Sequence, residues 1–377
     1  MLKTTEGSTG RLLQLCLGYF TFYVITGVTV KYFTGAAAAG YPGMKELEFL
    51  VYSTIGGNLI CLLVVFLLRW YKLHSNGMIQ LAGLKFPQEY LYIIPSGICT
   101  AVVIPTTTLM YTLPISVMVA MVIMRASVIV ISRIVDAVQI KQNILRKTVY
   151  KEENIAVVFA LVAAGVNIFW VGKGDFDFVH STAAMAILGS YIVAYTIRIY
   201  IMNYYKNTRA KGVKLDNQGF FAIEQIAASV VMLAVGMMLF YSHELFGSTS
   251  EQIGFYRSAF IEPKPVWSWA ILAGTAYGGV AFFSVFIFMF KGRTATFAGL
   301  VNRLTSLVAG TIATLLFAIS YGGRFPKIQD WVSLIFIFTA VAFLSVAEKK
   351  RTKELVLTHE IETPSLPKDL AVAGERS

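Results

Sequence analysis

The sequence predicts an all-α integral membrane protein with ten transmembrane helices, arranged as two inverted five-helix repeats with both termini in the cytoplasm. Three observations lead to this fold class. The 377 residues are 56% hydrophobic and only 14% charged, with a mean hydropathy of +0.66, whereas soluble domains contain about 25% charged residues. Ten apolar segments are long enough to span a bilayer. Lysine and arginine gather in alternate loops between those segments.

The predicted spans follow one another with short polar connections. The first is too long for the hydrophobic core of a signal peptide, so it is expected to be retained. We expect a cytoplasmic N-terminus over 1–11, a first repeat over 12–172, a second repeat over 182–347 and a disordered cytoplasmic tail over 348–377. The ten spans cover residues 12–33, 47–69, 90–111, 114–134, 153–172, 182–203, 218–242, 266–290, 294–320 and 329–347.

The basic residues indicate which ends of the spans face the cytoplasm, because cytoplasmic loops are enriched in Lys and Arg. One set of faces includes both chain ends, and the opposite loops are poorer in these residues. The net charge of +11 therefore reflects topology, and no nucleic-acid partner is expected. The basic clusters are Lys3 and Arg11; Arg69, Lys72 and Lys85; Lys141, Arg146, Lys147 and Lys151; Lys206, Arg209, Lys211 and Lys214; Lys291 and Arg293; and Lys349, Lys350, Arg351 and Lys353.

Five spans per half predict the inversion of the second repeat. A repeat with an odd number of spans enters the membrane from the other side the second time, as in many transporters with a solute site near the midplane. Arg303 lies 178 positions after Arg125. A short turn precedes the helix that carries each arginine. These two correspondences favour an internal repeat.

Arg125 and Arg303 lie near the middle of apolar segments. Arg125 is eleven residues past Pro114, about 16 Å along a helix, in a hydrocarbon core about 30 Å thick. A cation at that depth costs at least a few kcal/mol and usually faces a bundle interior or a solute pathway. Guanidinium groups suit phosphate and carboxylate. The two arginines are therefore predicted to bind an anionic solute; the alternative is a structural pair satisfied by carbonyls or a buried carboxylate.

Other charged residues lie within or beside the spans. Glu224 either couples proton movement to transport or is the counter-ion of Arg198 or of a site arginine, and the counter-ion role is favoured. Arg198 and Asp136 are expected to reach water from the cytoplasmic ends of their helices. Lys31 lies toward the outer end of the first span and is either a cation at the rim of the cavity or a support for the site.

Uncharged polar residues add further candidates for solute contact. The third span contains Pro95 and Pro105, and proline frees backbone carbonyls that threonine hydroxyls can address. Thr107, in the threonine run after Pro105, is therefore a candidate for the cavity wall, and a packing kink is the alternative. Tyr111 and Asn302 are expected near the cavity or its rim.

Signals of enzymes and cofactors do not occur in the sequence. It has no phosphate loop, zinc-protease motif or nucleophile elbow, so neither an enzyme, a metal site nor a cofactor is predicted. Its three cysteines lie in apolar spans without the spacing of a disulfide framework or a zinc site. Gly274 and Gly278 form a GxxxG pair that is expected to serve packing within the chain rather than dimerisation. A homodimer remains a possible assembly on the sequence alone.

Two segments resemble the drug/metabolite transporter superfamily, and in particular its nucleotide-sugar and phosphate-ester transporter branch. The run TLMYTLPISVMVAMVIMRASVIVISRIVDAVQIKQ is similar to the third and fourth helices of that superfamily, and KGRTATFAGLVNRLTSLVAGTIATLLF to the ninth. Gly299–Arg303, with the sequence GLVNR, is similar to the GALNK-type signature of GDP-sugar carriers, with arginine in place of lysine. TVKYF resembles the first-helix Asn-Lys pattern, with Val30 in place of asparagine. The resemblance implies substrate contacts by Arg125, Asn302 and Arg303, with Lys31 as an addition.

The leading hypothesis is a secondary-active transporter that moves an organic anion, such as a nucleotide-sugar or another phosphorylated metabolite, by alternating access and as an antiporter. An EamA-like exporter of amino acids or drug-like cations is the alternative within transport. A membrane scaffold or receptor without a transported solute is the alternative from another class. The bilayer is the expected environment, and the sequence leaves open a bacterial inner membrane or a eukaryotic membrane such as the Golgi.

Overall fold

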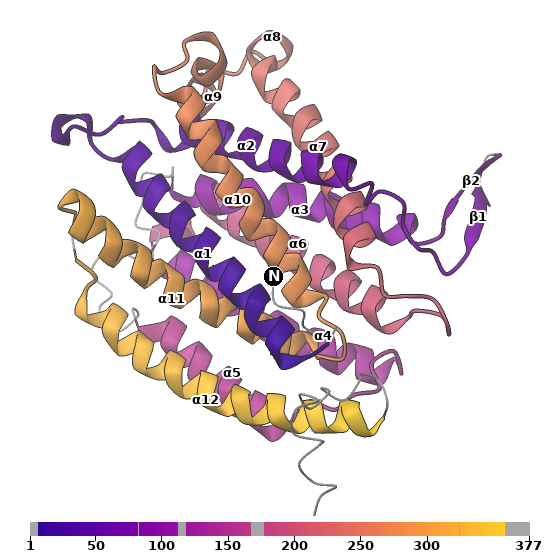
Figure 1. The fold of residues 1–377 in the computed structure, drawn as a ribbon. Coiled ribbons are helices and arrows are strands. Elements are labelled where there is room, and N and C mark those ends of the chain that lie inside the picture. Colours follow the sequence, from indigo (N-terminus) through magenta and orange to yellow (C-terminus); the bar gives the residue numbers. More distant parts are fainter. Residues whose placement is uncertain (1–6, 82, 112–117, 167–176, 324, 359–377) are drawn as a thin grey trace, which may run out of the picture.

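The computed structural model describes residues 7–81, 83–111, 118–166, 177–323 and 325–358. These residues form a helical bundle from which one short β-hairpin projects (Figure 1). The long helices are α1 (Thr9–Thr34), α2 (Glu46–Leu67), α3 (Tyr90–Tyr111), α4 (Met118–Lys141), α5 (Lys151–Gly165), α6 (Thr182–Asn207), α7 (Asn217–Phe240), α10 (Trp267–Phe288), α11 (Ala295–Tyr321) and α12 (Ile328–Leu357). The shorter elements are η1 (Ala37–Ala39), β1 (Met78–Leu81), β2 (Leu84–Pro87), η3 (Asp177–His180), α8 (Ser242–Phe246) and α9 (Glu251–Ile261).

Seven helices of the described chain are long and apolar enough to cross a membrane: α1, α2, α6, α7, α10, α11 and α12. The stretch Tyr90–Thr106 of α3 is a further apolar helix of shorter length. Large apolar side chains such as Leu63, Val193 and Phe338 point outward and are more than half exposed, which is the surface that lipid covers. The chain is a multi-pass, all-α membrane protein.

Each predicted span overlaps one long helix, and positions 114–117 and 167–172 of the predicted spans lie outside the described residues. Several helices continue beyond the apolar segment. The predicted fourth span ends at 134, whereas α4 runs to Lys141; the predicted last span ends at 347, whereas α12 runs to Leu357. Residues 348–357, expected in a disordered tail, are therefore helical. Their polar sequence stays folded because Arg351 and Leu355 are buried against the rest of the bundle. The hairpin, α8 and α9 were not predicted.

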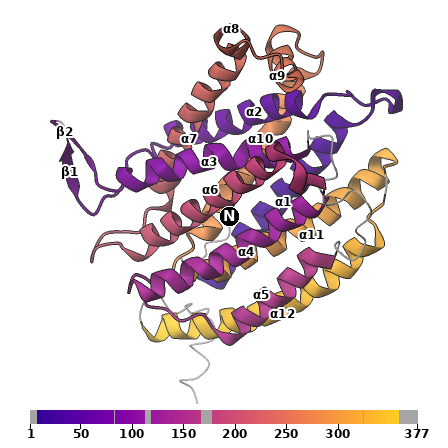
Figure 2. The same ribbon diagram turned by 180° about the vertical axis from the view of Figure 1, so that it is seen from behind.

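The helices pack in two groups that are joined in the middle. In the first group α1 contacts α10 and α11, and α2 contacts α10. In the second group α6 contacts α3 and α4, and α7 contacts α3. The groups meet where α4 packs against α11, and α5 and α12 lie side by side along one edge of the molecule (Figures 1 and 2).

Glycines allow α2 and α10 to touch through their backbones. A Cβ at Gly274 would lie 2.3 Å from the Ser53 carbonyl oxygen, and one at Gly278 would lie 2.6 Å from the Gly57 carbonyl oxygen. On α2, a Cβ at Gly56 would meet the Ile271 carbonyl oxygen at 1.9 Å. The prediction that the GxxxG pair packs within the chain is confirmed.

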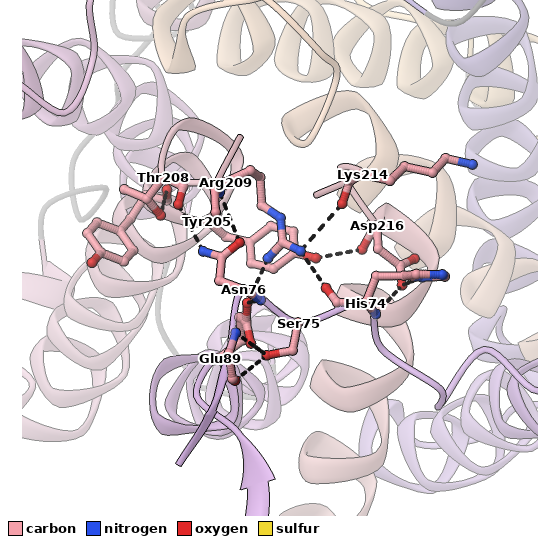
Figure 3. A network of polar contacts seen from close by, with 12 residues as sticks. His74, Ser75, Asn76, Glu89, Tyr205, Thr208, Arg209, Lys214 and Asp216 are labelled. Atoms are coloured by element: carbon pink, nitrogen blue, oxygen red, sulfur yellow. Dashed lines mark hydrogen bonds and ion pairs between the residues drawn. The ribbon is translucent and has the colours of Figure 1, made fainter. Parts of the chain in front are cut away.

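A buried ion pair holds the connection between α2 and α3, which carries the hairpin, against the connection between α6 and α7 (Figure 3). Glu89 and Arg209 are 2.8 Å apart, with their side chains 0% and 7% exposed. Glu89 also accepts hydrogen bonds from the Ser75 hydroxyl and from the Asn76 backbone N–H. Burial opposes ionisation of Glu89, but these hydrogen bonds outweigh it, so the pKa of the carboxyl group is lowered.

Candidate functional site

A cavity of about 650 Å³ lies between the two groups of helices. Its wall includes residues from the starts of α2 and α12 and from the end of α1, so it opens at the end of the bundle opposite to the chain termini. A volume of this size accommodates a metabolite or cofactor-sized ligand. The charged and aromatic residues of the wall are Tyr19, Tyr23, Lys31, Glu46, Phe49, Arg125, Tyr191, Tyr195, Arg198, Tyr277, Arg303 and Asp330.

Arg303 is a buried cation that has no carboxylate partner among the described residues. It lies on α11, and its side chain is 9% exposed. Nη2 donates a hydrogen bond to the Tyr191 hydroxyl at 3.2 Å, and the guanidinium lies over the Tyr195 ring, 5.1 Å from its centroid. Nε is buried and has no hydrogen-bond partner in the described residues. Within that part of the chain no carboxylate forms an ion pair with Arg303, so its charge is available to an anion in the cavity.

Arg125 lines the same cavity from α4 and is exposed. No ion pair or hydrogen bond joins it to another residue that the structure describes. Its position relative to Arg303 follows from the crossing of α4 and α11, which touch where Ser132 meets Gly299: a Cβ at Gly299 would lie 2.8 Å from the Ser132 Cβ. Arg125 precedes Ser132 by two helical turns, and Arg303 follows Gly299 by one. Both guanidinium groups therefore lie on the open side of the crossing.

Arg198 also lines the cavity, but its charge is neutralised by Glu224. Nε and Nη2 of Arg198 lie 2.9 Å from the two carboxylate oxygens, and the Ser96 hydroxyl donates to Oε1 at 2.6 Å. Glu224 is 2% exposed and does not line the cavity. Of the roles considered for Glu224, the structure shows the counter-ion of Arg198. The expectation that Arg198 reaches water is wrong, because the ion pair satisfies it inside the bundle.

Lys31 lies at the mouth of the cavity. Its Nζ donates a hydrogen bond to the Thr314 hydroxyl at 2.7 Å. Thr314 follows Arg303 by eleven residues on α11, which corresponds to about 16 Å. Glu46 and Asp330 line the same mouth. The cavity therefore has cationic groups at its base and a mixture of charges at its opening.

Asn302 does not line the cavity and is 1% exposed. Its Nδ2 donates to the Ser284 hydroxyl at 2.9 Å, and its Oδ1 lies 3.5 Å from the Tyr19 hydroxyl. Because Ser284 and Tyr19 both line the cavity, Asn302 acts on it by positioning them. The side chains of Thr107 and Tyr111 lie outside the described residues.

The other end of the bundle is closed by buried polar contacts. Asp136 of α4 accepts hydrogen bonds from the first backbone N–H groups of α11, at 2.8 Å from Ala295 and 2.6 Å from Thr296. Lys206 donates to the Phe288 carbonyl oxygen at 3.1 Å. Asp136 is 0% exposed, so the expectation that it reaches water is wrong. The carboxylate is stabilised by the free N–H groups and the positive end of the α11 dipole.

Further contacts at the closed end involve the end of α12. Arg293 forms a buried ion pair with Glu348, and the Thr294 hydroxyl donates to Glu153 at 2.7 Å. These contacts join the turn between α10 and α11 to α5 and α12. Among the described residues, this end of the cavity is therefore closed.

The aromatic residues around Arg303 were not among the predicted site residues. Tyr19 and Tyr23 on α1 have ring centroids 5.6 Å apart, and Tyr191 and Tyr195 on α6 have centroids 4.8 Å apart. The sequence contains a signal for both pairs, because residues four apart share one face of a helix. Without the arginines of other helices in view, that signal resembles ordinary core packing.

The fold and the site define a multi-pass membrane protein with a cationic cavity closed at one end. No protein-family model matches the chain, and no curated protein matches it. A solved crystal structure, named only as that of a protein, is similar with a TM-score of 0.55 and 13% sequence identity over 91% of this chain and 99% of the other. At that identity the likeness extends to the fold alone.

Proposed function

We propose that the protein is a secondary-active transporter that moves an organic anion across the membrane by alternating access. The observation that carries this proposal is Arg303, a buried guanidinium with a free Nε–H and without an ion-pair partner in the described chain, at the base of a cavity with one opening. An uncompensated cation in the membrane is costly, so its presence favours a functional role. Arg125 adds a second charge on the same side of the α4–α11 crossing.

The chemistry of the wall supports an anion with a polar body. Guanidinium groups bind phosphate and carboxylate with several N–H donors. Tyrosine rings on α1 and α6 and threonine hydroxyls on α1 and α11 offer stacking and hydrogen bonds to the remainder of the solute. A nucleotide-sugar or another phosphorylated metabolite meets these requirements.

The helix packing supports two inverted five-helix repeats, α1–α5 and α6 with α7, α10, α11 and α12. In this symmetry α1 to α5 correspond in order to α6, α7, α10, α11 and α12. The contacts of α1 with α10 and α11 then correspond to those of α6 with α3 and α4, and the contact of α2 with α10 corresponds to that of α7 with α3. All six contacts occur. The tyrosines support the same symmetry, since Tyr191 and Tyr195 each lie 172 positions after Tyr19 and Tyr23. We therefore propose ten spans with both termini cytoplasmic, and membership of the drug/metabolite transporter superfamily.

Exchange of one anion for another follows from the same charges. Reorienting an empty cavity carries the guanidinium charge of Arg125 and Arg303 through the membrane without a compensating anion, which is unfavourable. A bound anion neutralises that charge in both directions. The protein is therefore expected to work as an antiporter. An exporter of cations has less support, because both oxygens of Glu224 are already occupied by Arg198.

Thermal stabilisation of the purified protein tests the proposal. A ligand that binds the folded state raises its stability by about 2.7 kcal/mol at a hundred times its Kd. The panel comprises nucleotide-sugars, nucleoside monophosphates, sugar phosphates, amino acids and drug-like cations. We expect a phosphorylated compound to raise the Tm of the wild type, and Arg125→Ala and Arg303→Ala to abolish the increase.

Arg257→Ala is the matched control, because this arginine pairs with the exposed Glu244 outside the cavity. It is expected to retain the response. A compound that passes this test is then loaded into proteoliposomes, and uptake of the labelled compound is compared with and without internal counter-substrate. Stabilisation by cations alone, or an anion response that survives both cavity substitutions, would contradict the proposal; binding without flux would favour a receptor.

A further inference from the structure

The two cavity arginines are equivalent under the proposed symmetry but differ in their surroundings. Arg303 is docked on α6, with its guanidinium bonded to the Tyr191 hydroxyl and lying over the Tyr195 ring. Arg125 is exposed in the cavity, and neither an ion pair nor a hydrogen bond joins it to another described residue. Within the described residues, one guanidinium is therefore docked on a tyrosine pair and the other is not.

A second pair of tyrosines lies on α1. Tyr19 and Tyr23 have the same spacing of four residues as Tyr191 and Tyr195, and both line the cavity. Among the described residues no cation lies over either ring. The Tyr19 hydroxyl lies 3.5 Å from Asn302 Oδ1, which is at the limit of a hydrogen bond.

Exchange of the halves relates the two sets residue by residue. It converts α11 into α4 and α6 into α1, so that Arg303 corresponds to Arg125 and the Tyr191–Tyr195 pair to the Tyr19–Tyr23 pair. The docking observed for Arg303 in this state then has a counterpart in which Arg125 is the docked residue. That counterpart belongs to the state in which the cavity opens toward the chain termini.

We propose that Tyr19 and Tyr23 are positioning residues that dock Arg125 when the cavity opens toward the termini, while Arg303 is released from Tyr191 and Tyr195. The inference rests on the proposed inverted repeat and alternating access. In each state one guanidinium is docked on a tyrosine pair and the other faces the solute. An anion that enters from either side of the membrane then meets one undocked guanidinium. Each tyrosine pair stabilises the state in which it docks an arginine.

The docking contacts have the strength that such a role requires. A hydrogen bond donated by a charged group contributes enough to change an equilibrium constant by about tenfold. A guanidinium over a tyrosine ring adds a comparable contribution when the pair is shielded from water. Loss of one docked contact should therefore shift the ratio of the two states by about one decade.

Cysteine accessibility measures that ratio. In a background without Cys16, Cys61 and Cys99, Thr29→Cys reports the present opening, because Thr29 lines the cavity. Ala295→Cys reports the closed end, where Ala295 is 2% exposed. The rate of labelling by a hydrophilic maleimide is measured at each reporter in the full-length protein without added solute.

The two ring substitutions are expected to act in opposite directions. Tyr195→Leu removes the ring under Arg303, so labelling at Ala295→Cys should rise about tenfold and labelling at Thr29→Cys should fall. Tyr23→Leu removes the ring proposed for Arg125, so labelling at Ala295→Cys should fall below that of the parent. The hydroxyl substitutions Tyr191→Phe and Tyr19→Phe should repeat these signs with minimal change of packing.

A merely structural role would give a different pattern. If the tyrosines only pack the bundle, both ring substitutions should loosen it and raise labelling at Ala295→Cys together. A common direction for the two pairs, or no change with either, overturns the inference. Because labelling is measured without solute, these results are separate from the proposed anion specificity, which the binding panel tests.

Discussion

The close approach of α4 and α11 at Gly299 gives a prediction about the closed end of the cavity. In Gly299→Ala the new Cβ would lie 2.2 Å from the Ser132 Oγ and 2.8 Å from the Ser132 Cβ. The hydroxyl group is bonded to the Val128 carbonyl oxygen at 2.7 Å and its residue is 0% exposed. Rotation of the hydroxyl would relieve the first contact but not the second. The two helices must therefore move apart.

The cost of that separation follows from the neighbouring contacts. Overpacking of a well-packed interior costs about 1–3 kcal/mol. Asp136 lies one turn beyond Ser132, and its hydrogen bonds to the start of α11 would lengthen with the same movement. We therefore expect Gly299→Ala to lower the free energy of unfolding by an amount near the upper end of this range, about 3 kcal/mol. The corresponding fall in Tm is about 2–6 °C for a chain of this size.

Tm in detergent, measured by intrinsic fluorescence, is the assay, and the partner substitution gives the decisive comparison. Ser132→Gly removes both atoms that the new methyl group meets, so the double variant should recover most of the loss. The coupling between the two substitutions should exceed about 1 kcal/mol. Gly189→Ala is the control, since a Cβ there meets nothing within 4 Å and alanine is favoured in helices by about 0.5–1 kcal/mol.

Two outcomes would refute the reasoning. A Tm of Gly299→Ala equal to that of Gly189→Ala would mean that α4 and α11 do not touch at this point. Additive losses for Gly299→Ala and Ser132→Gly would mean that the cost arises elsewhere than in their contact.

Other positions give predictions of the same kind. Gly56→Ala should prevent folding into a monodisperse protein, because its Cβ would meet the Ile271 carbonyl oxygen at 1.9 Å and a backbone atom cannot rotate away; size-exclusion chromatography checks this. Asp136→Asn should lower stability by about 1–3 kcal/mol, since the carboxylate loses its charge at the start of α11; the Tm checks this. Glu89→Gln should cost about 3 kcal/mol at pH 7 through the buried pair with Arg209. The Glu89 pKa is lowered in the folded protein, so this stabilisation is present above the unfolded pKa of about 4.3 and is lost as the pH falls through the folded pKa; equal Tm values of variant and wild type at pH 7 would contradict it.

The positions of the long helices were predictable because hydropathy and loop charge depend on the sequence alone. Hydropathy identifies only the apolar part of a helix, so the last turns of α12 were not predicted. Their polar residues are helical because Arg351 is buried between the Tyr150 ring and Glu153. The hairpin was also missed: its strands pair from Met78 to Pro87 around Gly83, and four-residue strands carry little periodicity.

Residues that are unusual at their depth could be identified from the sequence as candidates, whereas a role that depends on a distant partner could not be assigned. Arg125 and Arg303 stood out because arginine is rare in apolar spans, and both line the cavity. Glu224, 26 residues from Arg198, was among the predicted counter-ion assignments, and the structure shows that pair. The role of Asp136 depends on the start of α11, which lies 159 residues away in the chain. No local pattern contains that information. A role for the tyrosine pairs can be inferred only when the arginine that packs against them is known.

The contact between α1 and α12 has a consequence for the order of the helices along the chain. The Thr9 hydroxyl at the start of α1 donates to Glu348 near the end of α12 at 2.9 Å and lies 3.3 Å from the Thr352 hydroxyl. The two ends of the described chain are therefore neighbours, and a short flexible linker could join them. A new start at the exposed turn Lys211–Gly212 would retain every helix–helix contact of the bundle. Such a circular permutant should fold to the same structure, with α7 synthesised first and α6 last.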